Sequence, residues 1–317
     1  MQNAFSRNPD APVLVIGAAS LDIVGRLLGE LHTGTSNPAQ IRTSLGGVAR
    51  NVAENLARLG HPVNLLTVVG DDENGNLLLQ RTAEAGVNVD NVTRASSHPT
   101  GAYLGVLNAN GELQVALDDM RALSQLTPAY LRQHAHLFQQ ASLLFVDANL
   151  SKESLSAALS LARKNNLSIC ADPTSILLAG KLNPFLPRLH MVTPNSAEAA
   201  ILAGQPVTAS RRREAMQAAK FLVGQGVQIV IITLAEFGAC YATSETAGHI
   251  PAIRTAVVDP TGAGDALTAT VIFSLLNDIP IDDAIRLGVS AASLTLSHPD
   301  SVWPELSLEK LYDHLMS

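Results

Sequence analysis

A glycine-rich string that ends in a carboxylate is the strongest candidate for chemistry in the sequence. It reads Asp259-Pro260-Thr261-Gly262-Ala263-Gly264-Asp265 and precedes an apolar stretch over 266–276, which predicts a helix. Unpaired backbone N–H groups at a helix N-terminus bind anions, phosphate above all. Asp265 would lie in the first turn beside that anion hole, where its carboxylate can accept a proton from a hydroxyl group. The string predicts phosphoryl transfer to an alcohol, with Asp265 as general base.

A second glycine-rich string opens the helix predicted over 47–59. It reads Gly46-Gly47-Val48-Ala49-Arg50-Asn51, and it places Asn51 one turn into the helix. An asparagine amide can both donate to and accept from sugar hydroxyls, and the glycines permit a close approach of the backbone to a ligand.

Each string also has a purely structural interpretation. The first could be a helix start in which Asp265 only satisfies the helix dipole, and the second a plain strand-to-helix turn.

The two strings together resemble the signatures of the ribokinase-like (phosphofructokinase-B type) carbohydrate and nucleoside kinases. Their order and spacing match, and the resemblance covers nearly the whole chain. Further positions fit the family pattern. Asp22, after the first predicted strand, resembles the sugar-binding aspartate, and Asn195 with Glu198 resembles an Asn-x-x-Glu motif. Within the family, the stretch 36–57 and the segment 117–120 resemble the pseudouridine kinases.

The resemblance implies a reaction and a role for each matching residue. The reaction is ATP- and Mg²⁺-dependent phosphorylation of the 5′-hydroxyl of pseudouridine, with Asp265 as base and Gly262, Ala263 and Gly264 as anion hole. Substrate contacts are expected from Asp22, Gly46, Gly47, Asn51, Asp118, Asp119 and Asn149. Contacts to ATP and its magnesium ion are expected from Asn195, Glu198, Thr233, Gly238 and Thr261, with Glu198 holding Mg²⁺ through water. A potassium ion near Asp259 is left open as an additional cofactor.

Two departures from the family pattern concern the nucleotide side. Ala235 stands where a glycine is usual, which predicts a slightly altered nucleotide loop, and Thr270 replaces a smaller residue in the helix after Asp265. Neither change removes a chemical group, so both leave the predicted activity in place.

Three other functions fit parts of the pattern. A ribokinase-like kinase for another nucleoside or a free sugar, such as adenosine or ribose, would use the same general residues. A non-catalytic nucleoside-binding protein would be expected to lack the base, whereas Asp265 is present here. A dinucleotide-binding dehydrogenase would require Gly-x-Gly-x-x-Gly after the first strand, and that place holds Gly17-Ala18-Ala19-Ser20-Leu21-Asp22 instead.

Composition and charge exclude several classes of protein. The 317 residues include 21 Lys and Arg against 28 Asp and Glu, and this acidic balance argues against nucleic acid or a membrane surface as a partner. The two cysteines, Cys170 and Cys240, form neither a disulfide framework nor a zinc motif, which favours a cytoplasmic location. Residues 1–12 lack the apolar core of a signal peptide. The expected partners are a nucleoside and ATP.

Alternation of short apolar strands with helices predicts the elements that position these residues. Strands are expected over 13–17, 63–69, 143–147, 167–172, 191–193 and 227–234, and helices over 47–59, 74–85, 128–140, 151–165, 209–224, 262–276 and 281–297. This order predicts a ribokinase-like α/β fold, a three-layer sandwich around a mostly parallel sheet. The whole chain, 1–317, is expected to form one domain. Segments 24–45 and 100–117 would form a small β lid that could pair with the lid of a second copy.

Overall fold

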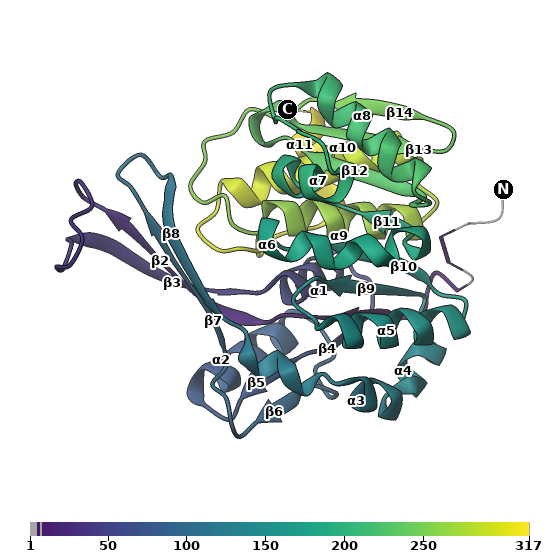
Figure 1. Ribbon diagram of the computed structural model, residues 1–317, viewed down its shortest axis with the longest axis horizontal. Coiled ribbons are helices and arrows are strands. Elements are labelled where there is room, and N and C mark those ends of the chain that lie inside the picture. Colours follow the sequence, from purple (N-terminus) through teal and green to yellow (C-terminus); the bar gives the residue numbers. More distant parts are fainter. Residues whose placement is uncertain (1–4, 7, 317) are drawn as a thin grey trace.

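The central sheet of the protein has eight strands, and helices cover both of its faces (Figure 1). The computed structural model describes residues 5, 6 and 8–316. The strands are β1 Val13–Ile16, β2 Ser20–Leu27, β3 Ala39–Gly46, β4 Val63–Leu66, β5 Val68–Gly70, β6 Thr93–Ala95, β7 Gly101–Leu107, β8 Leu113–Asp119, β9 Leu143–Asp147, β10 Ser168–Asp172, β11 Met191–Val192, β12 Ile229–Thr233, β13 Ala239–Thr243 and β14 Ala247–Ile250. The α-helices are α1 Val48–Arg58, α2 Glu73–Glu84, α3 Pro128–Gln133, α4 Ala135–Gln140, α5 Lys152–Lys164, α6 Ile176–Ala179, α7 Ser196–Ala203, α8 Arg212–Gly224, α9 Ala263–Leu276, α10 Ile281–Leu296 and α11 Leu308–Met316. Three 3₁₀ segments, η1 Arg121–Gln125, η2 Gly180–Arg188 and η3 Ala235–Phe237, complete these elements.

The order of strands in the central sheet is β14-β13-β12-β11-β10-β9-β1-β4. All neighbouring pairs from β12 to β4 are parallel, and the β12–β13 and β13–β14 pairs are antiparallel. The predicted α/β sandwich with a mostly parallel sheet is therefore confirmed. In sheets of this kind ligands bind beyond the carboxyl ends of the parallel strands, where the chain leaves for helices on opposite faces.

Two hydrophobic cores lie on the two faces of this sheet, because successive residues of a strand point to opposite sides. Leu14 and Ile16 of β1 belong to the core formed with α3, α4, α5, α7 and α8, whereas Val13 and Val15 belong to the core formed with α1, α9, α10 and α11. Each of these four side chains is completely buried. Full burial of such a side chain contributes about 1.5–3 kcal/mol, so these layers hold the strand ends in fixed positions.

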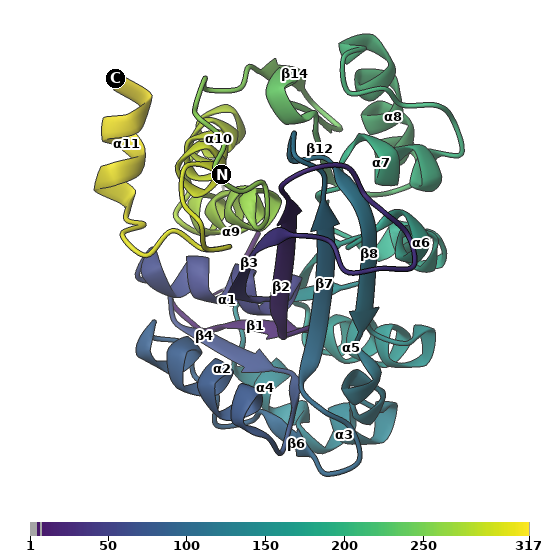
Figure 2. The same ribbon diagram turned by 90° about the vertical axis from the view of Figure 1, so that its left-hand side faces the viewer.

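A separate sheet of four strands projects from the body of the molecule (Figure 1), and its strands follow the order β3-β2-β7-β8 (Figure 2). It includes most of the two segments expected to form the lid. β2 pairs with β3 and β7 with β8 in antiparallel fashion, whereas β2 and β7 are parallel. The turn between β7 and β8 contains Asn110-Gly111, a pair that favours tight hairpin turns, and Gly111 has a φ of 89°, which an L-residue rarely adopts. We refer to these four strands as the lid.

The predicted helix over 128–140 is wrong in one respect. It is broken at His134, whose φ of −98° and ψ of 22° separate α3 from α4. The run predicted as one strand over 63–69 is likewise divided into β4 and β5, and β5 pairs only with β6 in a small sheet of its own. Within the described part of the chain, no helix combines the length and apolarity needed to cross a bilayer.

Candidate functional site

The two glycine-rich strings meet at the start of two helices. The first precedes α9 and the second precedes α1, and the Asn51 Nδ2 group donates a hydrogen bond of 2.8 Å to Asp265 Oδ2 across 214 residues of sequence. Both side chains are almost completely buried. The general base predicted from one string is therefore in contact with the sugar-binding amide predicted from the other.

Glycine is required at two points of these strings because the backbone leaves no room for a side chain. Gly47 has a φ of 90°, and a Cβ atom there would lie 2.5 Å from the carbonyl oxygen of Ala18. Gly262 has a φ of 81°, and its Cβ atom would overlap the carbonyl group of Ser301. At Gly264 the situation is the reverse, because no atom lies within 4 Å of the place that a Cβ atom would take, and the residue lines a cavity. The start of α9 is therefore packed on one side and open to a ligand on the other.

Burial strongly raises the pKa values of two carboxyl groups in this region, those of Asp265 and Asp22. Desolvation raises the pKa of Asp265 to about 7, although the hydrogen bond from Asn51 lowers it, and the carboxylates of Asp147, Asp22 and Glu198 raise it further. Desolvation also raises the pKa of Asp22 to about 6, against the opposing effects of the Ser20 hydroxyl and the Arg50 charge. A carboxyl group with a pKa near 7 can exchange a proton readily at physiological pH, as a general base must.

Asp22 lies in a row of side chains that crosses the lid. Asp22 on β2 is directly opposite Tyr103 on β7, which is directly opposite Asp118 on β8, so all three lie on the same face of the sheet. The carboxylates of Asp22 and Asp118 both raise the pKa of the Tyr103 hydroxyl, after the larger effect of burial. Gly46, on the other side of Asp22, has no room for a Cβ atom beside the Asp22 carboxylate. Tyr103 is a member of this row that the sequence did not single out.

Asp119 does not join this row, although the sequence predicted it as a substrate contact together with Asp118. Neighbouring residues of a strand point to opposite faces, and Asp119 pairs with Ala102 rather than with Tyr103. Its carboxylate accepts hydrogen bonds of 2.9 and 2.7 Å from the Arg121 guanidinium, which lowers the pKa of Asp119 to about 2. The structure therefore separates the two aspartates.

Asp147 holds the substrate side together, and sequence reasoning missed it. Its Oδ2 atom accepts hydrogen bonds from the backbone N–H groups of Ala18 (2.7 Å) and Ala49 (3.2 Å), and its Oδ1 atom accepts one from the backbone N–H group of Asn149 (2.9 Å). The predicted substrate residue Asn149 thus lies beside the loop that follows β1. Asp147 ends a buried strand, as Asp172 does on the neighbouring strand β10. A carboxylate that ends a parallel strand was the available signal, because such ends meet at one edge of the sheet.

A cavity of about 560 Å³ adjoins the start of α9 on its other side. Predicted nucleotide and anion-hole residues line it together with a largely apolar wall that includes Ile253, Leu267 and Val289. The predicted residues in this lining are Asn195, Thr233, Gly238, Ala263 and Gly264. Asn195 and Thr233 form an isolated parallel bridge, which places the end of β12 beside the start of α7. An apolar cavity next to the start of a helix suits a nucleotide, whose base has flat apolar faces and whose phosphates are charged.

Asn195 and Glu198 form a reciprocal cap at the start of α7. The Asn195 side chain accepts from the Glu198 N–H group, and Glu198 Oε2 accepts from the Asn195 N–H group, each at 2.9 Å. Burial raises the pKa of Glu198, and its charge in turn raises the pKa values of Asp172 and Asp265. Three mutually repelling carboxylates favour a cation nearby, and their oxygen atoms are the donors that Mg²⁺ prefers. Within residues 5, 6 and 8–316, no group of three or more His, Cys, Asp or Glu side chains is arranged to hold a metal ion directly.

The region around Asp259 differs from a simple loop because an arginine of the lid reaches it. Asp259 Oδ1 accepts from the Thr261 N–H group at 2.8 Å, and Asp259 Oδ2 forms an ion pair with Arg42 of β3. Asp259 is buried, whereas about a third of the Arg42 side chain is exposed. This ion pair joins the lid directly to the glycine-rich string.

The two departures from the family pattern have visible structural consequences. Ala235 takes up a left-handed conformation with a φ of 50°, so the loop predicted to contact the nucleotide keeps a glycine-like geometry at a cost of about 1–2 kcal/mol. Thr270 is completely buried, and its hydroxyl group has no hydrogen-bond partner within the described residues. The first departure leaves backbone strain at Ala235, and the second leaves the Thr270 hydroxyl group buried without a hydrogen bond among the described residues.

Comparison with known proteins agrees with this geometry. Residues 10–305 match the family described as pfkB family carbohydrate kinase. The chain is 33% identical over 297 residues to the pseudouridine kinase of Escherichia coli (93% of this chain, 94% of the relative) and 30% identical to the guanosine-inosine kinase of Exiguobacterium acetylicum (93% and 97%). Among solved structures, it resembles a carbohydrate kinase from Agrobacterium tumefaciens (TM-score 0.81, 28% identity, 96% and 97% covered) and Arabidopsis thaliana ribokinase complexed with ribose and ATP (TM-score 0.85, 21% identity, 97% and 99% covered). Matched along almost its whole length in sequence and in fold, the chain belongs to the pfkB family of carbohydrate kinases.

Proposed function

We propose that the protein transfers the γ-phosphoryl group of ATP to the 5′-hydroxyl of a nucleoside, and that pseudouridine is the preferred acceptor. The observation that carries the proposal is the position of Asp265. It is hydrogen-bonded to Asn51 near the lid, and it follows directly the Ala263 and Gly264 residues that line the nucleotide-sized cavity. One carboxylate thus lies where an acceptor hydroxyl and a transferring phosphoryl group would meet.

The proposed reaction assigns one task to each group. Asp22, an ionised carboxylate with several free lone pairs, would accept hydrogen bonds from the ribose 2′- and 3′-hydroxyls, with Gly46, Gly47 and Asn51 beside it. Asp265 accepts the proton of the 5′-hydroxyl as that oxygen forms a bond to the γ-phosphorus, and the bond to the bridging oxygen of ADP breaks. The backbone N–H groups at the start of α9 stabilise the negative charge on the transferring group.

The magnesium ion expected with ATP would lie near Glu198, and Thr261, Thr233 and Gly238 would complete the nucleotide side. When bound, the ion neutralises phosphate charge. The residues present fit it, since Glu198 and Asp172 supply carboxylate oxygens close to the start of α9.

The lid supports a nucleoside as substrate. A uracil C-nucleoside such as pseudouridine presents two ring N–H donors, one more than uridine, and a carboxylate is a strong acceptor for such donors. Asp118 lies in the same row as the proposed ribose ligand Asp22, two strands away. The similarity to two nucleoside kinases with different bases supports the nucleoside class, and the stretch 36–57 supports pseudouridine within it.

The two adjacent aspartates of β8 provide a matched test of this assignment. We expect Asp118→Ala to lower kcat/KM for pseudouridine by about 10-fold to 100-fold, the effect of losing one charge-assisted hydrogen bond. Asp119→Ala, on the opposite face, should change kcat/KM by less than about threefold. The measurement is ADP release with pseudouridine, uridine, adenosine, cytidine and ribose as acceptors. Equal effects of the two substitutions, or equal efficiency of the wild type on ribose or adenosine, would contradict pseudouridine as the substrate.

The sequence leaves open whether a potassium ion binds near Asp259. Such an ion would have to bind the Asp259 carboxylate together with the Arg42 side chain. Because the Arg42 guanidinium already pairs with that carboxylate, we infer that the enzyme works without potassium at this position. Equal turnover in buffers with potassium or with a large organic cation would support this, and an absolute potassium requirement would refute it.

The lid also offers a surface for a second copy of the chain. The face opposite Asp22 exposes Ile41, Leu104, Val115 and Leu117, which lie on three strands of one sheet face. We infer that two lids pair through this apolar face in a homodimer of single-domain protomers, as a second identical face supplies apolar surface of matching shape. Sedimentation of the wild type and of Leu117→Glu tests this, and a monomeric wild type would exclude it.

A cytoplasmic location also stays our inference, supported by two buried free cysteines and testable by cell fractionation.

A further inference from the structure

The amide of Asn51 is held in one orientation by the Arg50 guanidinium at one end and the Asp265 carboxylate at the other. Its Oδ1 atom accepts a hydrogen bond of 2.9 Å from Arg50 Nη1, while its Nδ2 group donates to Asp265. Ser301 Oγ lies 3.1 Å from the same Oδ1 atom, and its hydroxyl group also donates, over a shorter distance, to the Leu45 carbonyl oxygen. The opposite orientation would place the NH₂ group against the Arg50 guanidinium and the carbonyl oxygen against the Asp265 carboxylate, and neither pair could form a hydrogen bond. Arg50, which cannot accept a hydrogen bond, therefore determines which end of the amide faces the base.

Arg50 is itself fixed from several sides. Its guanidinium donates to the Leu45 carbonyl oxygen at 2.8 Å, lies 3.4 Å from the Thr82 hydroxyl, and forms an ion pair with Glu54 one turn further along α1. Only 4% of the residue is exposed. Glu54 is shared with Arg58, which donates two hydrogen bonds to the other carboxylate oxygen. A buried charge with this many partners is held in one position, and the direction of its bond to Asn51 is set with it.

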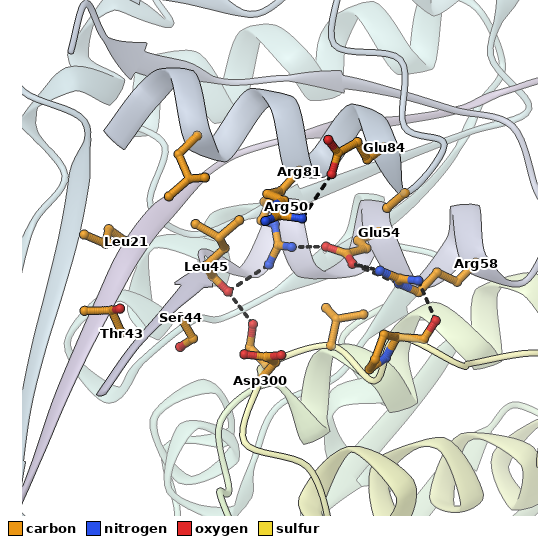
Figure 3. Close-up of a pocket in the computed structure, with 15 residues that line it drawn as sticks. Leu21, Thr43, Ser44, Leu45, Arg50, Glu54, Arg58, Arg81, Glu84 and Asp300 are labelled. Carbon is orange, nitrogen blue, oxygen red and sulfur yellow. Dashed lines mark hydrogen bonds and ion pairs between the residues drawn. The ribbon is translucent and has the colours of Figure 1, made fainter. Parts of the chain in front are cut away.

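A cavity of about 490 Å³ lies on this part of α1, and Arg50, Glu54, Arg58 and Ser301 are among its lining residues (Figure 3). Figure 3 shows Arg50 in the middle of the line of contacts from Leu45 to Glu54 and Arg58. Asp265 does not line this cavity. The cavity therefore gives small solutes access to the Arg50 position without passing through the proposed substrate site.

We propose that Arg50 is a positioning residue for the proposed phosphoryl transfer, which sets the Asn51 amide so that it donates to Asp265 and supplies a buried positive charge that faces the acceptor site. The carboxylates that act on Asp265 from the elements around it are those of Asp22 on β2, Asp147 on β9, Asp172 on β10 and Glu198 on α7. Arg50 on α1 is a cation that interacts with both Asp22 and Asp265. Its positive charge favours the ionised form of Asp265, whereas the surrounding carboxylates favour the protonated form. This inference rests on the proposed function.

Arg50→Ala is the direct test, and Arg58→Ala is its matched control because Arg58 shares Glu54 and does not contact Asn51. We expect Arg50→Ala to lower kcat by about 10-fold to 100-fold, as loss of orientation does, and to move the acid limb of the kcat/KM profile to higher pH. Arg58→Ala should change kcat by less than about fivefold and leave the acid limb in place. Arg50→Lys, which keeps the charge without the fork of donors, should restore the acid limb more than it restores kcat.

Chemical rescue separates this role from a general loss of structure. Guanidinium chloride, at concentrations far below those that unfold proteins, should enter the cavity and raise the kcat of Arg50→Ala, whereas urea, which is neutral, should not. Should Arg50→Ala fail to fold, Arg50→Lys is compared with Arg58→Ala in kcat, which the loss of the fork of donors should still lower. A wild type without turnover overturns the proposed function. An active wild type with Arg50 variants that match the Arg58→Ala control in kcat and pH profile, and that guanidinium does not rescue, overturns the positioning role alone.

Discussion

Replacing Asp265 with asparagine is expected to lower kcat by about 10³-fold to 10⁴-fold, the upper range for loss of a general base. The amide has nearly the same shape as the carboxylate but cannot take the proton of the 5′-hydroxyl. ATP affinity should remain near that of the wild type, because the N–H groups at the start of α9 and the cavity beside them are unchanged. Steady-state kinetics together with a nucleotide-binding measurement check both parts. A kcat within tenfold of the wild type would show that Asp265 is not the base.

The same substitution should stabilise the ligand-free protein at alkaline pH. Burial raises the pKa of Asp265 from 3.8 to about 7, so folding favours its protonated form. The stabilising contribution of this proton is complete below pH 3.8 and is lost as the pH rises through about 7. At pH 8 the wild type must keep an ionised carboxylate buried, whereas the asparagine variant is neutral. The Tm of the variant should therefore exceed that of the wild type at pH 8, and the difference should shrink as the pH approaches 4.

Replacing Gly262 with alanine is expected to lower kcat by about 10²-fold to 10³-fold, the effect of disturbing an oxyanion-type site. The new Cβ atom would overlap the Ser301 carbonyl group, and the residue would keep a φ of 81° only under strain. Ser301 Oγ also lies 3.1 Å from Oδ1 of the Asn51 amide, so its displacement disturbs the partner of the base as well. Steady-state kinetics of the variant measure this loss.

Gly60→Ala provides the matched control for this prediction. Gly60 has a φ of 89° but no atom within 4 Å of the Cβ position, so the substitution introduces backbone strain without a collision. We expect it to cost about 1–2 kcal/mol of stability and leave kcat unchanged. If Gly262→Ala and Gly60→Ala lower kcat equally, the close packing at the start of α9 has no part in catalysis.

Sequence patterns predicted the parts of the fold that follow from local chemistry. The parallel strands were found because they are buried on both faces and therefore read as continuous apolar runs, as in Leu143–Asp147. Strands β13 and β14 were missed because they are short and contain Ala, Gly and Thr in place of a clear apolar run. The break at His134 was missed because no proline or glycine marks it.

In the candidate site, too, residues marked by a local pattern were predicted, and residues whose contacts depend on the fold were missed. Asp265 and Asn51 were found from the glycines beside them, because glycines in the local sequence mark places where the backbone turns sharply or approaches another group closely. Asp147 was missed because its partners are backbone groups far along the chain, such as the Ala18 N–H group 129 residues away. Arg50 was missed because the burial of an arginine on a helix cannot be read from the local sequence. Tyr103 was missed because the register of β7 against β2 and β8 cannot be read from a single strand. Asp119 was grouped with Asp118 because both lie beyond the predicted lid segment 100–117, whereas β8 continues to Asp119 and its alternation separates them.

Identification of the phosphorylated product is the most direct test of the proposed reaction. The protein is incubated with ATP, Mg²⁺ and pseudouridine, and the nucleoside product is isolated and examined by phosphorus and proton NMR, with Asp265→Asn as the blank. We predict a single product with phosphate on the 5′-oxygen, formed in equal amount to ADP by the wild type and absent from the blank. A phosphate on another hydroxyl, ADP formed without a nucleoside phosphate, or equal product from the Asp265→Asn variant would contradict the proposed reaction.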